Sequence, residues 1–187
     1  MDKMTLAVLL LWMTSGGSEP DTPKSPKGAV AMHAITIVST AFKQMEPIPE
    51  IYTCDGADVS PPLSWSEVPP AARSIALVCD DPDAPRGTWV HWVAYDLPPT
   101  CTALPQGVEK TKTLKGGGKQ GKNDFPKIGY NGPCPPRGMH RYYFKIYALD
   151  TMLDLPPGMT RREVEKAMKG HILAQGELVG TYARKPK

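Results

Sequence analysis

Two apolar runs near the middle of the chain, residues 74–81 and 89–97, give the strongest hydrophobic pattern in the sequence. The first run is rich in β-branched and apolar residues and ends abruptly in acidic residues and prolines. This pattern is typical of a buried strand that leads into a rigid loop. A short basic turn separates the first run from the second, which also has strand character. We therefore predict two neighbouring strands around which the rest of the chain is organised.

Polar side chains lie at the ends of these two predicted strands. Period-two alternation places the carboxylate of Asp81 on an apolar face of the first strand. It places the imidazole of His91 on the same face of the second strand as Val93, Tyr95 and Leu97. Leaving a buried polar group unpaired costs about 1–3 kcal/mol. Each of the two groups is therefore expected to meet a partner or a ligand.

Three further strands are predicted at residues 33–39, 141–149 and 177–183. The first alternates around two isoleucines. The second follows His140. Period-two alternation places His140 on the same face as the apolar residues Tyr142, Phe144 and Ile146. A second histidine is thus predicted at the end of a strand, on a face that is mainly apolar.

One helix is predicted near the C-terminal end of the sequence. Thr160 and Glu163 fit a capping box, and Gly176 is a suitable stop. Apolar residues follow the cap at helical spacing, namely Val164, Ala167, Met168, Ile172 and Leu173. The chain also has 21 prolines, which favour turns over long helices. The predicted fold class is mostly β (α+β), with one or two helices.

The first 31 residues differ from the rest in composition. Residues 6–13 form an apolar segment behind Lys3, far shorter than the roughly 20 residues of a transmembrane helix. The segment indicates the core of a secretory signal peptide, and residues 15–27 have linker composition. We predict a folded domain at 32–187 without a stable transmembrane span, exported if the segment is a signal peptide and cytoplasmic otherwise. A mis-assigned start or a disordered tail is the alternative.

Charge and cysteine content narrow the range of partners. The net charge of +3, with 22% charged residues, includes no basic block of the kind that binds nucleic acid. The four cysteines include no C-x-x-C pair, which argues against a structural zinc site. An even number of cysteines in a candidate for export allows disulfides. Cys54 and Cys134 lie in predicted loops and could pair, a question that the sequence leaves open.

Residues 98–126 form a long segment without predicted structure, and such segments in compact domains are usually functional or mobile. Residues 116–123 nearly match a phosphate-binding loop. However, Asn123 replaces the hydroxyl residue that would hold magnesium, no apolar strand precedes the loop, and Pro126 opposes a following helix. We therefore do not predict nucleotide binding.

Four polar residues, Asp81, Asp83, His91 and His140, recur at strand ends beside rigid loops. They suit a transition metal in residue type, but the helical spacing of common metal motifs is missing. A His–Asp pair also suits hydrolysis, but the sequence has no G-x-S-x-G element. Histidines held by carboxylates beside the glycine backbone at Gly132 suit an anion or phosphoryl pocket. In the structural alternative, the aspartates cap a turn and the histidines are satisfied core residues.

Several separated blocks resemble the signature sequences of the phosphatidylethanolamine-binding protein family, also called the Raf kinase inhibitor family. These blocks are Asp81-Pro-Asp-Ala-Pro85, Trp89-Val-His91, and Gly132-Pro133 with Gly138-Met-His140-Arg-Tyr142. Others are similar to the bacterial and archaeal branch, namely Tyr52-Thr-Cys-Asp-Gly56, Ser60-Pro-Pro-Leu63, His91–Leu97, Gly170–Gln175 and Leu178–Tyr182. The similarity extends from about Met32 to Tyr182.

The resemblance implies a large antiparallel sheet packed with a smaller sheet, peripheral helices, and a small anion-binding pocket at one end. It also implies a cis bond between Ala84 and Pro85. Val90 replaces a second histidine of many eukaryotic members, and no equivalent of the animal C-terminal helix is expected, so kinase regulation is not predicted. By motif position, the residues that line or shape the pocket are Asp81, Asp83, Pro85, His91, Gly132, Pro133, His140 and Tyr142.

The predicted function is that of a non-enzymatic binding protein, without catalytic residues, cofactor or metal. Its expected ligand is phosphate or a phosphorylated small molecule, such as a phosphatidylethanolamine-like headgroup. The alternative function is that of a protease inhibitor or protein-binding regulator that uses residues 98–126. A homodimer is compatible with either function.

Overall fold

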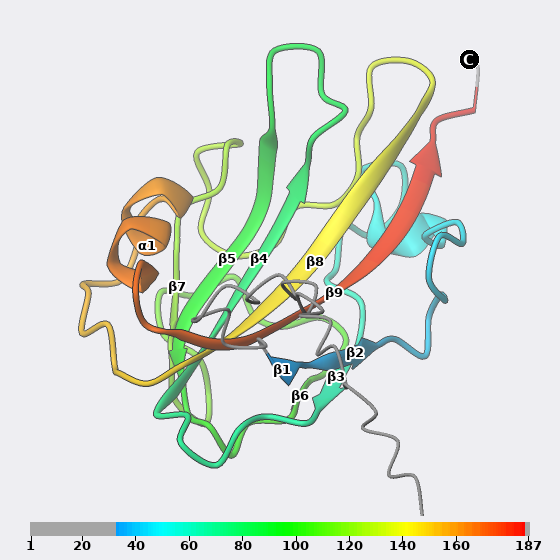
Figure 1. The fold of residues 1–187 in the computed structure, drawn as a ribbon. Coiled ribbons are helices and arrows are strands. Elements are labelled where there is room, and N and C mark those ends of the chain that lie inside the picture. Colours follow the sequence, from blue (N-terminus) through cyan, green and yellow to red (C-terminus); the bar gives the residue numbers. More distant parts are fainter. Residues whose placement is uncertain (1–32, 186–187) are drawn as a thin grey trace, which may run out of the picture. The chain divides into compact units, whose positions relative to one another are not determined.

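A computed structural model describes residues 33–185, and its central feature is a six-stranded sheet (Figure 1). The strands, in spatial order, are β1 (His33–Ala34), β9 (Ile172–Ala183), β8 (Met139–Leu149), β4 (Ser74–Asp81), β5 (Trp89–Leu97) and β7 (Lys119–Gln120). β4 and β8 lie in the interior of the sheet, and all neighbours pair antiparallel except β1, which runs parallel to β9.

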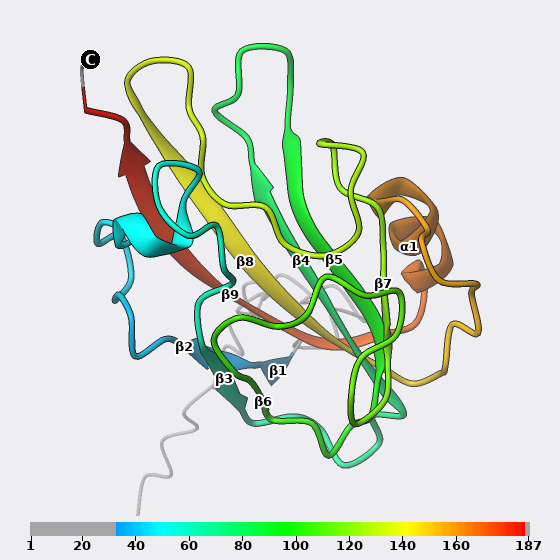
Figure 2. The same ribbon diagram turned by 180° about the vertical axis from the view of Figure 1, so that it is seen from behind.

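A smaller antiparallel sheet and a single α-helix complete the described fold (Figure 2). The smaller sheet contains β2 (Thr36–Val38), β3 (Leu63–Ser66) and β6 (Ala103–Leu104). The helix α1 spans Arg161–Met168, and a 3₁₀ turn, η1, spans Glu50–Tyr52. The prediction of a mostly β fold with a large sheet, a smaller sheet and peripheral helical elements is confirmed.

The two faces of β4 are buried in two different cores. Ile75 and Leu77 pack into the large core shared with the smaller sheet, whereas Ala76 belongs to the cluster beneath α1 with Val164 and Met168. A strand that is covered on both faces has no need of polar alternation. This explains why residues 75–79 form an unbroken apolar run, because every residue of β4 is buried.

A β-bulge in β5 determines the position of His91. Cys79 pairs with Trp92, but the next residue of β4, Asp80, pairs with Val90. His91 is therefore the extra residue on the bulged strand and has no direct partner on β4. Bulges of this kind redirect a side chain, and here the redirected side chain is an imidazole.

The predicted face of His91 is wrong because of irregularities in β5. Val93 and Tyr95 pack toward α1, whereas Leu97 lies in the large core on the other side of the sheet. His91 contacts a ring of that same large core rather than the α1 side. A second irregularity, with Asp96 at a φ of 54°, returns Leu97 to this side. Strict period-two alternation does not hold across two such irregularities.

Helix α1 has the predicted beginning but a different end. Thr160 accepts a bond from the amide of Glu163, and the Glu163 carboxylate accepts one from the amide of Thr160, so the capping box is confirmed. The helix ends at Met168 and not near Gly176. Gly170, at a φ of 87°, starts the reversal of the chain, and β9 takes up the residues predicted as the last helical turns.

The other predictions for the described chain are partly correct. Ile35 and Ile37 are buried as their alternation indicates, but residues 33–39 divide into β1 and β2, which belong to different sheets. The segment 98–126 contains β6 and β7. Within residues 33–185, no helix has both the length and the apolar character needed to cross a bilayer. The predicted signal-like segment lies outside the described residues.

Candidate functional site

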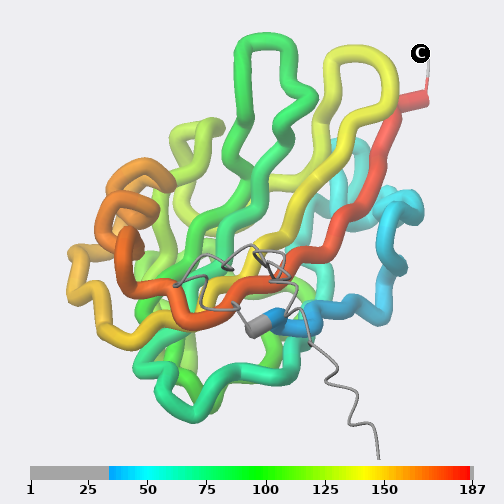
Figure 3. Tube along the Cα trace, viewed as in Figure 1, coloured from blue at the N-terminus to red at the C-terminus, as the bar shows by residue number. Residues whose placement is uncertain are grey.

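Two loops at one end of the larger sheet enclose the candidate site. Residues 82–88 connect β4 to β5, and residues 132–138 lead into β8, and both loops project from the same end of the molecule (Figure 3). A cavity of about 180 Å³ lies between them. Its lining residues are Asp81, Ala84, Pro85, Arg86, Trp89, His91, Phe125, Cys134, Pro135, Pro136 and His140.

A buried carboxylate–imidazole pair forms one wall of the cavity. Asp81 ends β4 and His140 lies at the start of β8, and the Nδ1 of His140 is 2.7 Å from an Oδ of Asp81. Both residues are buried, at 3% and 6% exposure. The predicted face of His140 is confirmed, because His140, Tyr142 and Phe144 lie at alternate positions of β8 and all three are buried.

His91 forms the second polar position in the cavity. Its Nδ1 lies 2.7 Å from the backbone carbonyl of Asn131. The rings of Phe125 and Tyr142 meet the imidazole edge-on, with centroids 5.3 and 5.2 Å away. Burial lowers the pKa of His91 below its usual value, because the imidazolium form loses its hydration there. Burial thus favours the neutral form of His91, whose ring lines the cavity.

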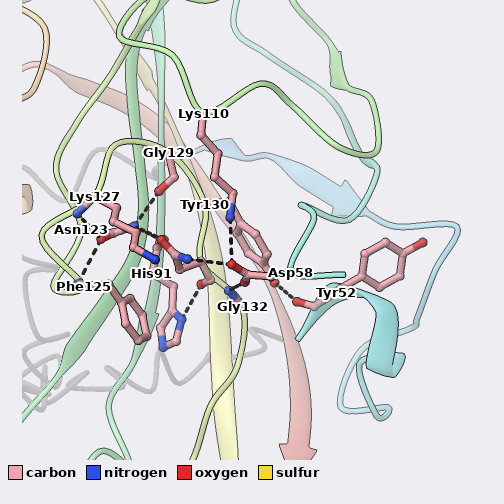
Figure 4. Close-up of polar contacts among 11 residues, drawn as sticks. Tyr52, Asp58, His91, Lys110, Asn123, Phe125, Lys127, Gly129, Tyr130 and Gly132 are labelled. Carbon is pink, nitrogen blue, oxygen red and sulfur yellow. Dashed lines mark hydrogen bonds and ion pairs between the residues drawn. The ribbon is translucent and has the colours of Figure 1, made fainter. Parts of the chain in front are cut away.

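A network around Asp58 holds the partner of His91 in place (Figure 4). One carboxylate oxygen of Asp58 accepts from the backbone amide of Gly132 at 2.6 Å. The other accepts from the side-chain amide of Asn131 at 2.7 Å and from the ammonium of Lys110 at 2.8 Å. These bonds fix the backbone of residues 131–132, and with it the carbonyl that orients His91.

Asn123 anchors the neighbouring loop from within the same network (Figure 4). Its side-chain amide donates to the carbonyl of Gly129 and to the side-chain oxygen of Asn131, both at 2.9 Å. Its side-chain oxygen accepts from the amides of Phe125 and Lys127. Asn123, the last residue of the segment 116–123 that nearly matches a phosphate-binding loop, therefore has a structural role. It positions the aromatic ring of Phe125 beside the cavity.

Some of the predicted site residues face other partners. Asp83 binds Arg141 through both carboxylate oxygens, at 2.7 and 2.8 Å, and this pairing lowers its pKa to about 2. The backbone amide of Gly132 donates to Asp58. A Cβ at this glycine would lie 2.1 Å from the carbonyl oxygen of Tyr52. Close packing of two backbone segments thus accounts for the glycine.

The remaining predicted residues lie near the cavity in different ways. Pro85 lines it, whereas the carbonyl of Pro133 accepts from the amide of Cys54 at 3.1 Å. Tyr142 is fully buried beneath His91, and burial raises the pKa of its phenol. The structure therefore brings Asp81, Pro85, His91 and His140 together, although 59 positions separate Asp81 from His140.

The bond between Ala84 and Pro85 is trans, so the expectation of a cis bond, which the resemblance implied, is wrong. The loop is closed in another way. Gly87 adopts a φ of 99° and donates its amide to the carbonyl of Ala84 at 3.2 Å. A glycine with positive φ provides the reversal that a cis proline would otherwise give.

A disulfide between Cys54 and Cys134 secures one wall of the cavity. The two Cα atoms are 5.4 Å apart, and Cys134 is a lining residue. The bond joins the segment that follows η1 to the loop before β8. Three lining residues that sequence reasoning did not single out, Arg86, Trp89 and Phe125, add a cation and two aromatic rings to the cavity. Within residues 33–185, no cluster of His, Cys, Asp and Glu side chains could hold a metal ion.

Sequence comparison connects this fold and site with known proteins. The family model described as "Phosphatidylethanolamine-binding protein" matches residues 38–183. A UPF0098 protein of Methanothermobacter thermautotrophicus is 52% identical over 144 residues, covering 77% of this chain and 95% of the relative. A UPF0098 protein of Pyrococcus horikoshii is 45% identical over 185 residues, covering 97% of this chain and 86% of the relative.

Structure comparison gives the same result. A crystal structure of a putative phosphatidylethanolamine-binding protein homolog from Chlamydia trachomatis matches with a TM-score of 0.75 and 42% identity, covering 82% of this chain and 99% of that one. Escherichia coli YbcL, described as a new member of the mammalian family, matches with a TM-score of 0.74 and 33% identity. That match covers 83% of this chain and all of the YbcL chain, 100%.

Proposed function

Because the chain belongs to the phosphatidylethanolamine-binding protein family, we propose that it is a binding protein with a cavity for an anion or a phosphorylated headgroup. The observation that carries this proposal is the convergence of His91, His140 and Asp81 on one cavity. Arg86 adds a permanent positive charge to the lining. A volume of about 180 Å³ is below the usual range of drug-sized ligand pockets, so it suits a headgroup or a free anion.

The lining supports binding rather than covalent chemistry. It contains no serine, threonine or lysine, and its cysteine is tied up in a disulfide. Catalysis by a hydroxyl, thiol or amine nucleophile needs such a side chain within reach of a base. The lining places no hydroxyl of serine or threonine, free thiol or amine beside the two histidines. We propose a non-enzymatic protein on this ground, and activity assays with phosphomonoesters and acyl esters test it.

Calorimetric titration tests the proposed function. The full chain is titrated with phosphate and with phosphorylethanolamine, as the wild type and as His140→Ala. The proposal predicts saturable binding that is lost or at least about tenfold weaker in the variant, because a charge-assisted hydrogen bond is removed. His171→Ala is the matched control, since His171 also binds an aspartate at 2.7 Å but on an exposed surface. Absence of binding to the wild type would refute the proposal.

A second candidate function, regulation of a protease or another protein, is supported by the segment 98–126. Gln120 holds this segment by donating to the carbonyls of Glu109 and Thr111, both at 2.7 Å, while its side-chain oxygen accepts from Trp92. A pre-organised loop loses little entropy on binding a partner. Stoichiometric inhibition of a serine protease with the loop left intact would support this function, and rapid cleavage within residues 98–126 would refute it.

We also propose that the protein works in an oxidising compartment, as the predicted signal-like segment implies. The supporting observation is the Cys54–Cys134 disulfide, since such bonds persist mainly outside the reducing cytoplasm. Fractionation of the producing cells with alkylation of free thiols tests this. Recovery of the protein from the cytoplasm with both thiols reduced would contradict the proposal.

A further inference from the structure

The two cavity histidines have the same tautomer, and this tautomer determines which hydrogen bonds a ligand can make. A carbonyl oxygen only accepts, so the Nδ1 of His91 must carry the proton that it shares with Asn131. The Nδ1 of His140 likewise donates to the Asp81 carboxylate. In each neutral imidazole the Nε2 is then a hydrogen-bond acceptor. Among residues 33–185, the 2.7 Å hydrogen bonds of both rings are made by Nδ1. The backbone of Gly132 also raises the pKa of His91, but by less than burial lowers it, and both rings line the cavity.

The partners of the two rings differ in charge. A second proton on His140 is compensated by the buried carboxylate of Asp81 at 2.7 Å. His91 has an uncharged carbonyl as its partner, and the rings of Phe125 and Tyr142 enclose it. Compensation for an added positive charge is therefore stronger at His140, which faces a carboxylate, than at His91, which faces a carbonyl.

Other charges near the two rings do not change this order. Asp83 and Arg141 neutralise one another beside His140, and Arg86 lies in the loop of residues 82–88 that lines the cavity. The charges of Asp81 and Asp124 raise the pKa of His91, but the larger effect of burial lowers it. The cavity thus contains one site for a positive donor and one neutral acceptor.

Resting on the function proposed above, we propose that the cavity binds the singly charged, protonated form of a phosphomonoester or of free phosphate. An anionic oxygen of the ligand accepts from Nε2–H of protonated His140, while the P–OH group donates to Nε2 of His91. Both polar atoms that the rings present to the cavity are then satisfied.

This assignment distinguishes ligands of equal size and charge. A sulfate ester and a phosphodiester carry a single negative charge but have no acidic proton to donate. Either ligand would place an oxygen lone pair against the Nε2 lone pair of His91. A site built to bond a ligand hydroxyl strongly rejects the analogue without it, because a buried acceptor is left unpaired. An intact phospholipid with a diester headgroup would therefore bind more weakly than the corresponding monoester.

Titration of the full chain with methyl phosphate, methyl sulfate and dimethyl phosphate tests the proposal. At pH 5 all three carry about one negative charge, because the second pKa of a phosphomonoester is about 6. We expect methyl phosphate to bind at least about tenfold more tightly than the other two. We expect this preference to shrink by pH 8, where methyl phosphate has lost its P–OH proton.

His91→Gln provides a further test within the same cavity. A glutamine amide can donate as well as accept, so the variant should bind methyl sulfate and methyl phosphate with similar affinity. His171→Gln is the control and should keep the wild-type preference, because its ring lies on the surface beside Asp150. The wild-type comparison does not depend on how well either variant folds.

The outcomes separate this inference from the function on which it rests. Preference for methyl phosphate at pH 5, lost in His91→Gln, supports the inference. Equal or tighter binding of methyl sulfate or dimethyl phosphate by the wild type overturns it, while anion binding itself stands. If none of the three ligands binds, both the inference and the proposed function fail.

Discussion

Asp80 and Asp81 are neighbours at the end of β4, but their side chains serve two different regions of the molecule. Asp80 lies on the α1 side, 1% exposed, with Lys145 at 2.9 Å and Arg161 at 3.1 Å. Asp81 lies on the cavity side with His140. One buried aspartate therefore has permanently charged partners, and the other has a partner whose charge depends on its protonation state.

The difference shows that adjacent residues of the same type can have separate roles, one in stability and the other in ligand binding. The Asp80 cluster joins β4, β8 and α1, because its cations come from the second and third of these elements. Its charges are balanced within the protein. The Asp81–His140 pair has a ring nitrogen that faces the cavity, so its charge can be balanced by a ligand. For these two aspartates we therefore expect a substitution of Asp80 to lower mainly stability and a substitution of Asp81 to lower mainly ligand affinity.

The largest expected effect on stability comes from the covalent bond on the cavity side. Changing Cys54 and Cys134 together to serine should lower the free energy of unfolding by about 3–4 kcal/mol, because the bond closes a long loop in the unfolded chain. The two cysteines are 80 positions apart. Denaturant unfolding measures the effect. Cys101→Ser, which removes a free cysteine, is the control, with a change within about 0.5 kcal/mol. A double variant as stable as the wild type would contradict this role.

Asp80→Asn should have the next largest effect on the free energy of unfolding. It leaves the ammonium of Lys145 and the guanidinium of Arg161 without their common partner, at a cost of about 2–3 kcal/mol in unfolding free energy. Phosphate affinity should remain near that of the wild type. Thermal unfolding and calorimetry give the two values. Glu165→Gln removes the more exposed partner of Arg161 and should cost less than about 1 kcal/mol. A loss of binding in Asp80→Asn would remove the distinction between the two faces.

Asp81→Asn should have the opposite result, with a small loss of stability and a large loss of phosphate affinity. The asparagine oxygen can still accept from His140, so the loss of stability should stay near about 1 kcal/mol. Phosphate affinity should fall at least about tenfold, because the charge that stabilises the imidazolium is gone. Asp150→Asn, at the exposed pair with His171, is the control and should leave affinity unchanged. Unchanged phosphate binding in Asp81→Asn would show that the pair is structural.

The smallest effect concerns the exposed pair of Asp83 and Arg141. The pKa of Asp83 is lowered to about 2, so its contribution is complete above its normal pKa and is lost as the pH falls toward 2. Because Arg141 is largely exposed, Asp83→Asn should cost less than about 1 kcal/mol at pH 7. The variant should also have a weaker dependence of unfolding free energy on pH between about 4 and 2. An identical acid dependence in wild type and variant would contradict this assignment.

Local patterns predicted much of the fold because local interactions determine them. The capping box at Thr160 and the burial of Ile35 and Ile37 depend on residues a few positions apart. The end of α1 could not be predicted, because pairing of β9 with β8 competes for the same apolar residues. The position of His91 could not be predicted either, since a β-bulge depends on how two strands pair and not on the pattern within one.

The site was predicted as far as motifs and strand ends allow. Asp81 and His140 were visible as polar residues on apolar faces. Asp58 was not, because its partner Asn131 is 73 positions away and the side chain lies in a turn-rich segment where aspartate is common. The mismatch of Asn123 to the phosphate-loop motif gives no sign that its side chain anchors the backbone beside the cavity. A hydrogen bond between residues as far apart as Asp58 and Asn131 leaves no local signal in the sequence.

The nitrogen NMR signals of the histidine side chains, recorded with and without phosphate, report directly on whether the two cavity rings bind the anion. We expect the Nε2 signals of His91 and His140 to shift on saturation, with His140 moving toward the protonated form and His91 staying neutral. His171, on the exposed surface, should not respond. Unchanged signals from both cavity histidines at saturating phosphate would contradict the central claim that these two rings bind the anion.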